Sequence, residues 1–221
     1  MVDDALWQLI GKGVLETVYM TLVSTLFAYL IGLPLGVIIV VTEKGGILEK
    51  RALNNVLNVI VNITRSIPFL ILLIAIIPFT RFIVGTTIGM NATVVPLVIA
   101  AFPFVARLVE ASIKEVDQGV IEAAKSLGAS PFQIIWKVMI AEARPSLIMG
   151  CAIATTTILS YSAMAGIVGG GGLGDIAIRY GLYRYEPVTM MITVILLVAL
   201  VQLFQEIGTR ITKKQDKRKA G

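Results

Sequence analysis

The sequence predicts an all-α integral membrane protein with five transmembrane helices. Hydrophobic residues make up 57% of its 221 residues and charged residues only 15%, whereas a soluble domain averages about 25% charged residues. Residues 17–42, 82–106, 145–174 and 187–205 contain no charged residue, and residues 52–80 contain one. Because a helix needs roughly 20 apolar residues to cross a bilayer, these five stretches predict five spans.

The first span is predicted at about residues 14–42, after a short external leader over residues 1–13. The leader lacks the basic residues that open a signal peptide, so we expect the span to be retained. Gly32, Pro34 and Gly36 favour a kink in this helix. Apolar stretches such as LIGLPLGVIIVV do not alternate with polar residues, which excludes β-barrel strands.

The second span is predicted at about residues 54–80 and contains Arg65. Pro68 follows three residues later and removes a helical hydrogen bond. Intramembrane charges are costly and usually face a cavity or a partner. Arg65, Ser66 and Pro68 are therefore candidate pathway residues, with Arg65 meeting the carboxylate of a zwitterion. We favour the structural alternative, in which Arg65 pairs with an acid such as Glu110 or with backbone carbonyls at the break.

Lysine and arginine are unevenly divided between the two sides of the membrane. With the C-terminus inside, the inner segments hold fourteen of the nineteen basic residues and the outer segments hold four. Since cytoplasmic loops are enriched in basic residues, we expect the N-terminus outside and the C-terminus in the cytoplasm. The tail at residues 209–221 is then a membrane anchor beside anionic headgroups, and it implies no nucleic-acid partner.

A charged cytoplasmic loop at residues 111–144 separates the third span, at about residues 89–110, from the fourth, at about residues 145–168. In DQGVIEAAKSLG, Asp117 is the expected N-cap and Gly128 the left-handed residue that ends the helix. The residues at helical spacing, which predict one apolar face, are Val120, Ile121, Ala124 and Leu127. The following SPFQ has the pattern of a capping box and predicts a second helix. From these residues alone, the first helix is either a docking element for a protein or an interfacial connector.

The segment EAAKSLGASPFQIIWKVMI resembles the cytoplasmic loop of membrane subunits of bacterial ABC importers. That loop has Glu-Ala-Ala and a glycine four residues after the second alanine, which Glu122, Ala123, Ala124 and Gly128 match. Ala141 stands where the family usually has proline. The segments RSIPF, IPFTR and YSAMAGIVGGGGLG, in this order, are similar to the permease subunits of methionine ABC importers.

The resemblance implies a type I ABC importer permease fold over a transmembrane domain at residues 14–208. It implies that Glu122, Ala123, Ala124, Leu127 and Gly128 belong to a coupling helix that seats in a groove of a separate ATPase. It further implies a homodimer in the bacterial cytoplasmic (inner) membrane, two ATP-binding subunits and an external methionine-binding protein.

The fourth span ends in SYSAMAG, where small residues such as Ser162 permit close helix packing. Tyr161 and Met164 are larger and lie three residues apart. If they face a pathway, their apolar bulk would form a gate against water and ions. Tyr161, Ser162 and Met164 are therefore candidate pathway or gate residues, with helix packing as the alternative.

The glycine run GGGGLG at residues 169–174 formally fits G-x-G-x-x-G. It follows a membrane helix rather than a strand, and no Lys-Ser or Lys-Thr follows it, so a nucleotide site is not expected. We expect a flexible outer loop instead, followed by the fifth span at about residues 187–207. ATP and magnesium would then bind to the partner ATPase, with no cofactor on this chain.

The sequence offers no set of residues for bond chemistry. It has no histidine, and its one cysteine, Cys151, lies inside the fourth apolar segment. No catalytic residue and no metal site are therefore predicted, and a membrane-embedded enzyme is disfavoured.

The leading interpretation is the permease subunit of an ATP-driven importer that forms the pathway for D- and/or L-methionine. One alternative is a permease of the same architecture for another small solute. A second is a self-sufficient secondary transporter, against which the lack of paired intramembrane charges and of an inverted repeat counts.

Overall fold

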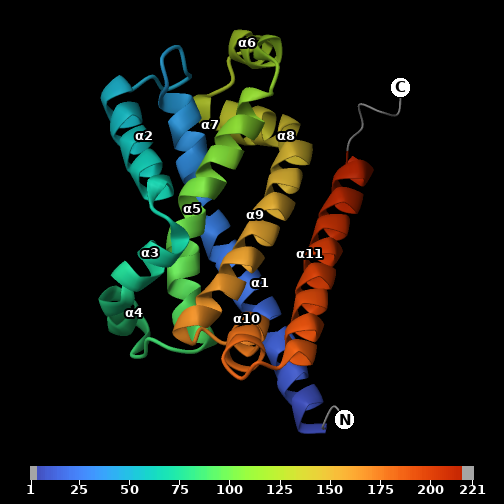
Figure 1. The fold of residues 1–221 in the computed structure, drawn as a ribbon. Helices are drawn as coiled ribbons and strands as arrows, with labels where there is room; N and C mark the ends of the chain where they lie inside the picture. The colour runs from blue at the N-terminus through green and yellow to red at the C-terminus, as the bar shows by residue number, and fades with distance from the viewer. Residues whose placement is uncertain (1–3, 216–221) are drawn as a thin grey trace.

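The structure, a computed structural model that describes residues 4–215, consists of helices and their connections over that range (Figure 1). The four long helices are α1 (Asp4–Thr42), α5 (Met90–Lys114), α9 (Arg144–Met164) and α11 (Pro187–Gln215). Four helical stretches of the described chain are long and apolar enough to cross a membrane. The predicted all-α fold class is confirmed for the described residues.

The predicted second span is broken rather than straight. Its two halves, α2 (Arg51–Ser66) and α3 (Phe69–Ala75), meet at a bend of 99°. Ile67 is extended at the break and Pro68 precedes the first residue of α3, as expected where proline removes a backbone donor. The helix α4 (Ile77–Val84) follows. The molecule therefore reaches five spans only when α2 and α3 are counted as one.

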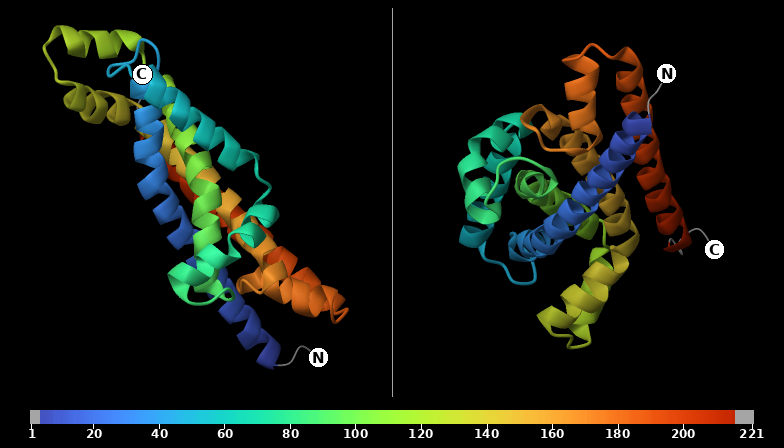
Figure 2. Two further views of the ribbon diagram at one scale, coloured as in Figure 1. Left: turned by 90° about the vertical axis from the view of Figure 1, so that its left-hand side faces the viewer. Right: turned by 90° about the horizontal axis from the view of Figure 1, so that it is seen from below.

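Short elements join the long helices at both ends of the molecule. Between α5 and α9 lie α6 (Gln118–Ser126), α7 (Pro131–Gln133), the π-helical η1 (Ile134–Met139) and α8 (Ile140–Glu142). Between α9 and α11 lie the 3₁₀ turn η2 (Ala165–Val168), α10 (Gly172–Ile176) and the π-helical η3 (Ala177–Leu182). The segment from α6 to α8 projects from the long helices at the end where α11 finishes (Figures 1 and 2).

Two helices extend beyond their predicted limits. Because α1 begins at Asp4, the described part of the expected leader is helical and continuous with the first apolar stretch. Helix α11 runs to Gln215, so the first part of the predicted basic tail is also helical. The rest of that tail, residues 216–221, lies outside the described residues.

The central packing contact joins α1 to α5. An added Cβ at Gly36 would lie 2.5 Å from the carbonyl oxygen of Ala106, and one at Gly32 would lie 2.7 Å from Cγ1 of Val105. Val105 and Ala106 are fully buried. The two glycines, four residues apart, therefore let the helix backbones approach as small residues do in membrane helix pairs.

We predict that Gly36→Ala will destabilise the protein by about 1–3 kcal/mol, because the added methyl group forces α1 and α5 apart. Gly11→Ala is the matched control, since a Cβ on Gly11 meets nothing within 4 Å and alanine favours the helix by roughly 0.5–1 kcal/mol. Thermal unfolding in one detergent would compare them. Equal melting temperatures for the two variants would contradict this account of the packing.

Candidate functional site

Helix α6 has the predicted caps at both ends. The Asp117 carboxylate accepts a hydrogen bond of 2.6 Å from the Gly119 N–H at the first turn. At the other end, the Gly128 N–H donates to the Lys125 carbonyl at 2.9 Å, and Gly128 has a φ of +78°. Such a left-handed residue ends a helix cheaply only when it has no Cβ. Asp117 and Gly128 therefore fix where α6 begins and ends.

The four residues predicted to form one apolar face of α6 differ in their burial. Ile121 is buried and Ala124 is half-buried, but Val120 is exposed and Leu127 is 88% exposed. Helical spacing identifies neighbours around a helix, but it does not show how many of them the rest of the protein covers. Leu127 lies beyond the last turn of α6, where it presents its side chain to the surroundings.

The segment after α6 packs some of its apolar side chains into the core and leaves other large ones exposed. Ser130 and Gln133 form the predicted capping box, with the Ser130 N–H donating to Gln133 Oε1 at 2.9 Å. Ile134 and Met139 are buried in the core. Exposed large apolar residues of the projecting segment are Val120, Leu127, Phe132 and Trp136. Exposed apolar side chains concentrated at one end are typical of a protein contact surface.

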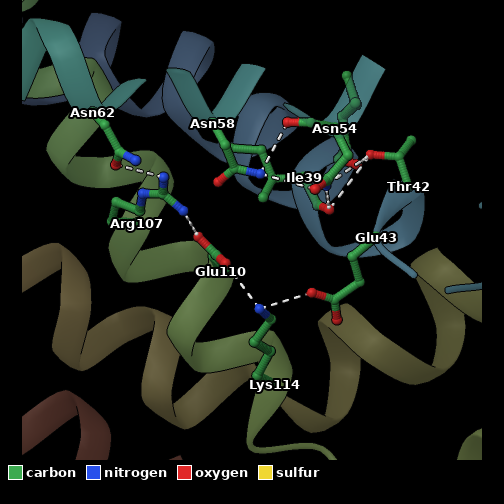
Figure 3. Close-up of polar contacts among 10 residues, drawn as sticks. Ile39, Thr42, Glu43, Asn54, Asn58, Asn62, Arg107, Glu110 and Lys114 are labelled. Atoms are coloured by element: carbon green, nitrogen blue, oxygen red, sulfur yellow. Dashed lines mark hydrogen bonds and ion pairs between the residues drawn. The ribbon is translucent and has the colours of Figure 1, made fainter. Parts of the chain in front are cut away.

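A charge network ties α5 to α1 (Figure 3). Lys114 Nζ lies 2.8 Å from Glu43 Oε2 and 2.9 Å from Glu110 Oε1. Arg107 pairs with Glu110 from three residues away on the same helix. The predicted pairing of Arg65 with Glu110 is therefore wrong, because two basic residues one helical turn away already occupy that carboxylate.

Helix α2 joins this network through asparagines spaced by four residues. Asn62 Oδ1 accepts a hydrogen bond of 2.7 Å from Arg107, and Asn54 donates to the Ile39 carbonyl of α1 at 2.6 Å. Asn58 donates to Asn54 Oδ1 at 2.9 Å (Figure 3). Interhelical amide hydrogen bonds of this kind hold membrane helices together. This asparagine ladder was not predicted, although the four-residue spacing of Asn54, Asn58 and Asn62 in an apolar segment could have indicated it.

The candidate residues of the second span lie at its break. Arg65 is exposed in the last turn of α2, and within residues 4–215 it forms no ion pair. The Ser66 hydroxyl donates to the Asn62 carbonyl, one turn back along α2, at 2.8 Å. Pro68 leads directly into α3, whose first residue is Phe69.

The fourth-span candidates face three different surroundings. Tyr161 stacks on Phe69, with ring centroids 4.6 Å apart and planes 3° from parallel. Ser162 is buried and donates to the Leu159 carbonyl at 2.7 Å. Met164 is 39% exposed. The structure thus brings Tyr161 to the residue that follows Pro68, whereas Ser162 contributes to the core.

The glycine run is a packed element, which corrects the expected flexible loop. The Gly172 and Leu173 N–H groups donate to Glu16 Oε2 at 2.8 Å and Thr17 Oγ1 at 2.9 Å, so α1 caps the start of α10. The Thr93 hydroxyl of α5 donates to the Gly170 carbonyl at 3.1 Å. All five residues of α10 are buried. Glycine here permits close backbone contact rather than looseness.

Comparison with known proteins places this arrangement in a family. Residues 29–214 match the family described as binding-protein-dependent transport system inner membrane component. This chain belongs to that family. A probable D-methionine transport system permease of Vibrio cholerae serotype O1 is 51% identical over 203 residues, which cover 92% of this chain and 90% of the relative. The D-methionine transport system permease of Escherichia coli K12 is 48% identical over 166 residues, covering 75% and 76%.

Solved structures give the same result for the fold. The inward-facing methionine ABC transporter MetNI has a chain that superposes with a TM-score of 0.96 at 46% identity, covering 97% of this chain and all of that one. An amino acid ABC transporter, at 22% identity, superposes with a TM-score of 0.76 over 94% of each chain. The predicted type I ABC importer permease fold is thereby confirmed, and the chain is an inner-membrane permease subunit.

We predict that Tyr161→Leu will lower stability by about 1 kcal/mol, because stacked aromatic pairs contribute about 0.5–1.5 kcal/mol beyond their buried area. Tyr161→Phe keeps the ring and serves as the control, with little change expected. Thermal unfolding in detergent would measure both. A loss as large for phenylalanine as for leucine would show that the hydroxyl, rather than the stack, matters.

Proposed function

We propose that this chain forms the membrane pathway of an ATP-driven importer for methionine, in the D and/or L form. The observation that carries the proposal is its similarity to relatives named as D-methionine permeases, at 51% and 48% identity. The superposition on a methionine ABC transporter, with a TM-score of 0.96, supports the same substrate class.

The functional assembly would contain a second copy of this chain, two ABC ATPase subunits that bind ATP and magnesium, and an external methionine-binding protein. The large exposed apolar residues along α11, including Val188, Met191, Ile195 and Val198, suit contact with lipid or with the second copy. The described part of α11 ends at the same end of the molecule as α6 (Figure 1). This supports a cytoplasmic position for both, with the start of α1 outside.

Helix α6, with Glu122, Ala123, Ala124, Leu127 and Gly128, would be the coupling helix that seats on the ATPase. Its exposed side chains support this role, since a docking surface must be uncovered in the free chain. ATP would draw the two ATPases together and displace α6, and the spans would exchange between inward and outward states.

The charge network supplies a physical route for that displacement. Helix α5 ends four residues before α6 begins, and Lys114 in its last turn pairs with Glu43 beyond the end of α1. Arg107 bonds to Asn62 of α2. A movement of α6 would therefore act on α1, α2 and α5 together.

Arg65, Ser66, Pro68, Tyr161, Ser162 and Met164 remain the proposed pathway residues. The contact of Tyr161 with Phe69 supports a site where α9 meets the bend between α2 and α3. The guanidinium of Arg65 is exposed near that bend and forms no ion pair within residues 4–215, so it would attract the carboxylate of an amino acid.

Uptake by proteoliposomes tests the proposed function directly. The full chain would be reconstituted with its ATPase and binding protein, and ATP-dependent entry of radiolabelled methionine would be compared with entry of leucine and glutamine. Methionine-selective uptake is expected. Selective uptake of another solute would refute the methionine assignment, and uptake without ATP or an ATPase would favour a secondary transporter.

We predict that Leu127→Ser will weaken ATPase binding by about tenfold or more, because burying a leucine side chain contributes about 1.5–3 kcal/mol. The fold should persist, since Leu127 is 88% exposed in this chain. Leu182→Ser is the control, an exposed leucine at the opposite end of the molecule. Co-purification of the ATPase would measure the effect, and equal retention by both variants would exclude Leu127 from the interface.

We predict that Met164→Ala will make resting proteoliposomes leaky or uncouple ATP hydrolysis from uptake, because it removes apolar bulk at a proposed gate. Ile83→Ala, at an exposed position of α4, should change neither quantity. Leakage of a trapped small solute and the ratio of ATP hydrolysed to methionine imported would be recorded. Wild-type values for both would remove Met164 from the gate.

A further inference from the structure

A polar cleft of about 230 Å³ lies between α6 and the connection from α1 to α2. One side consists of residues 43–47, where the chain leaves α1. The other side includes Gln118, Ile121 and Lys125, which follow one another at helical spacing on α6. The cleft is several times larger than the roughly 30 Å³ that one water occupies in the liquid, so it can hold a headgroup-sized ligand.

Glu43 is the acidic residue of the lining, and it is already neutralised. The Glu43 carboxylate lines the cleft but lies 2.8 Å from Lys114 Nζ. Nearby, Glu49 accepts a hydrogen bond from the Gly45 N–H at 2.8 Å and pairs with Arg51 at 2.7 Å. These contacts lower the pKa of Glu49, the Gly45 bond most of all, so it remains ionised and engaged.

The basic residues of the lining are Lys44 and Lys125. Lys44 and Lys125 approach the cleft from opposite sides, one from the α1–α2 connection and one from α6. Over the described residues, neither forms an ion pair. Because Glu43 is neutralised by Lys114, the lining carries two uncompensated positive charges, and it suits an anion.

We propose that this cleft binds a phosphate group, and that the group belongs to an anionic membrane lipid. The cleft lies just past the end of α1, where the chain turns back into the apolar helix α2. Leu53, Val56 and Ile60 on α2 are exposed and offer apolar surface to acyl chains. Basic residues at such a boundary attract anionic lipid headgroups.

A lipid bound there would join α6 to the α1–α2 connection through its phosphate. Any effect of this link on transport rests on the proposed coupling role of α6, but the binding of the lipid itself does not. Binding can be measured without ATP, methionine or a partner subunit, so a failure of this proposal and a failure of the transport function would be distinguishable.

The test uses the full chain in a neutral detergent, with dioctanoyl phosphatidylglycerol as the anionic probe and dioctanoyl phosphatidylcholine as the neutral one. Calorimetry should show tighter binding of phosphatidylglycerol. Lys44→Gln combined with Lys125→Gln should weaken it about 30-fold, from the usual contribution of a basic residue at an anionic surface. The matched control, Lys137→Gln with Lys213→Gln, removes the same charge from exposed positions outside the cleft and should change affinity less than about twofold.

A third variant tests the charge argument without altering a residue of the lining. Lys114→Met removes the partner of Glu43 and leaves an uncompensated carboxylate at the cleft, so phosphatidylglycerol affinity should fall several-fold. An unchanged affinity would contradict the role assigned to Glu43 and Lys114. Equal losses in the cleft variant and the matched control would indicate general attraction to positive charge and would overturn the proposal.

Inorganic phosphate distinguishes the two sources of the phosphate group. If it fails to displace phosphatidylglycerol at matched ionic strength, the lipid is the ligand, as proposed. If phosphate alone binds in a manner that depends on Lys44 and Lys125, the phosphate site stands but its source is the free ion, and the lipid assignment is refuted. If neither probe depends on the two lysines, there is no site.

Discussion

The close approach of α1 and α5 is the contact on which the rest of this structure depends. Gly32 and Gly36 allow it because a side chain at either position would collide with α5. At one end, Glu16 and Thr17 of α1 and Thr93 of α5 hold the glycine-rich segment before α11. At the other end, the same two helices share the ion pair of Glu43 and Lys114. A change in their packing would therefore reach both ends.

Several polar groups of this membrane protein bond to one another where helices meet, because unpaired polar groups are costly in an apolar medium. The asparagine ladder of α2 bonds to α1 and to Arg107, and Glu110 has basic neighbours on both sides. Helix α2 can therefore leave an apolar face exposed and still be held tightly. The bend after Ser66 has a different contact, the aromatic stack of Phe69 with Tyr161.

The parts of the fold that composition controls were predictable from the sequence. Long uncharged stretches must lie in an apolar environment, and Asp117, Gly128 and the Ser130–Gln133 box act through neighbours in the chain. The family pattern around Glu122 also identified the projecting segment. Pro68 signalled the break in the second span, although no local rule gives the 99° angle.

The rest could not be predicted where the sequence allowed more than one partner or environment for the same residue. Glu110 could have paired with Arg65, but Arg107 and Lys114 are nearer along one helix. Four successive glycines are compatible with a loose loop or with tight packing, and only the positions of Thr17 and Thr93 decide between them. The helical spacing that groups Leu127 with Ile121 on α6 does not show which of the two side chains the rest of the protein buries.

The length of α1 has a mechanical consequence. Its 39 residues make a rod of roughly 58 Å, far longer than the roughly 30 Å of bilayer hydrocarbon. Helix α5 packs closely against α1 at Gly32 and Gly36, and Pro34 lies between these two contacts. These contacts lie nearer the Thr42 end of α1 than the Asp4 end, so α1 could pivot about them. A small displacement of the short part of α1 beside Glu43 would then produce a larger displacement of its long part, which carries Glu16 and contacts the glycine segment.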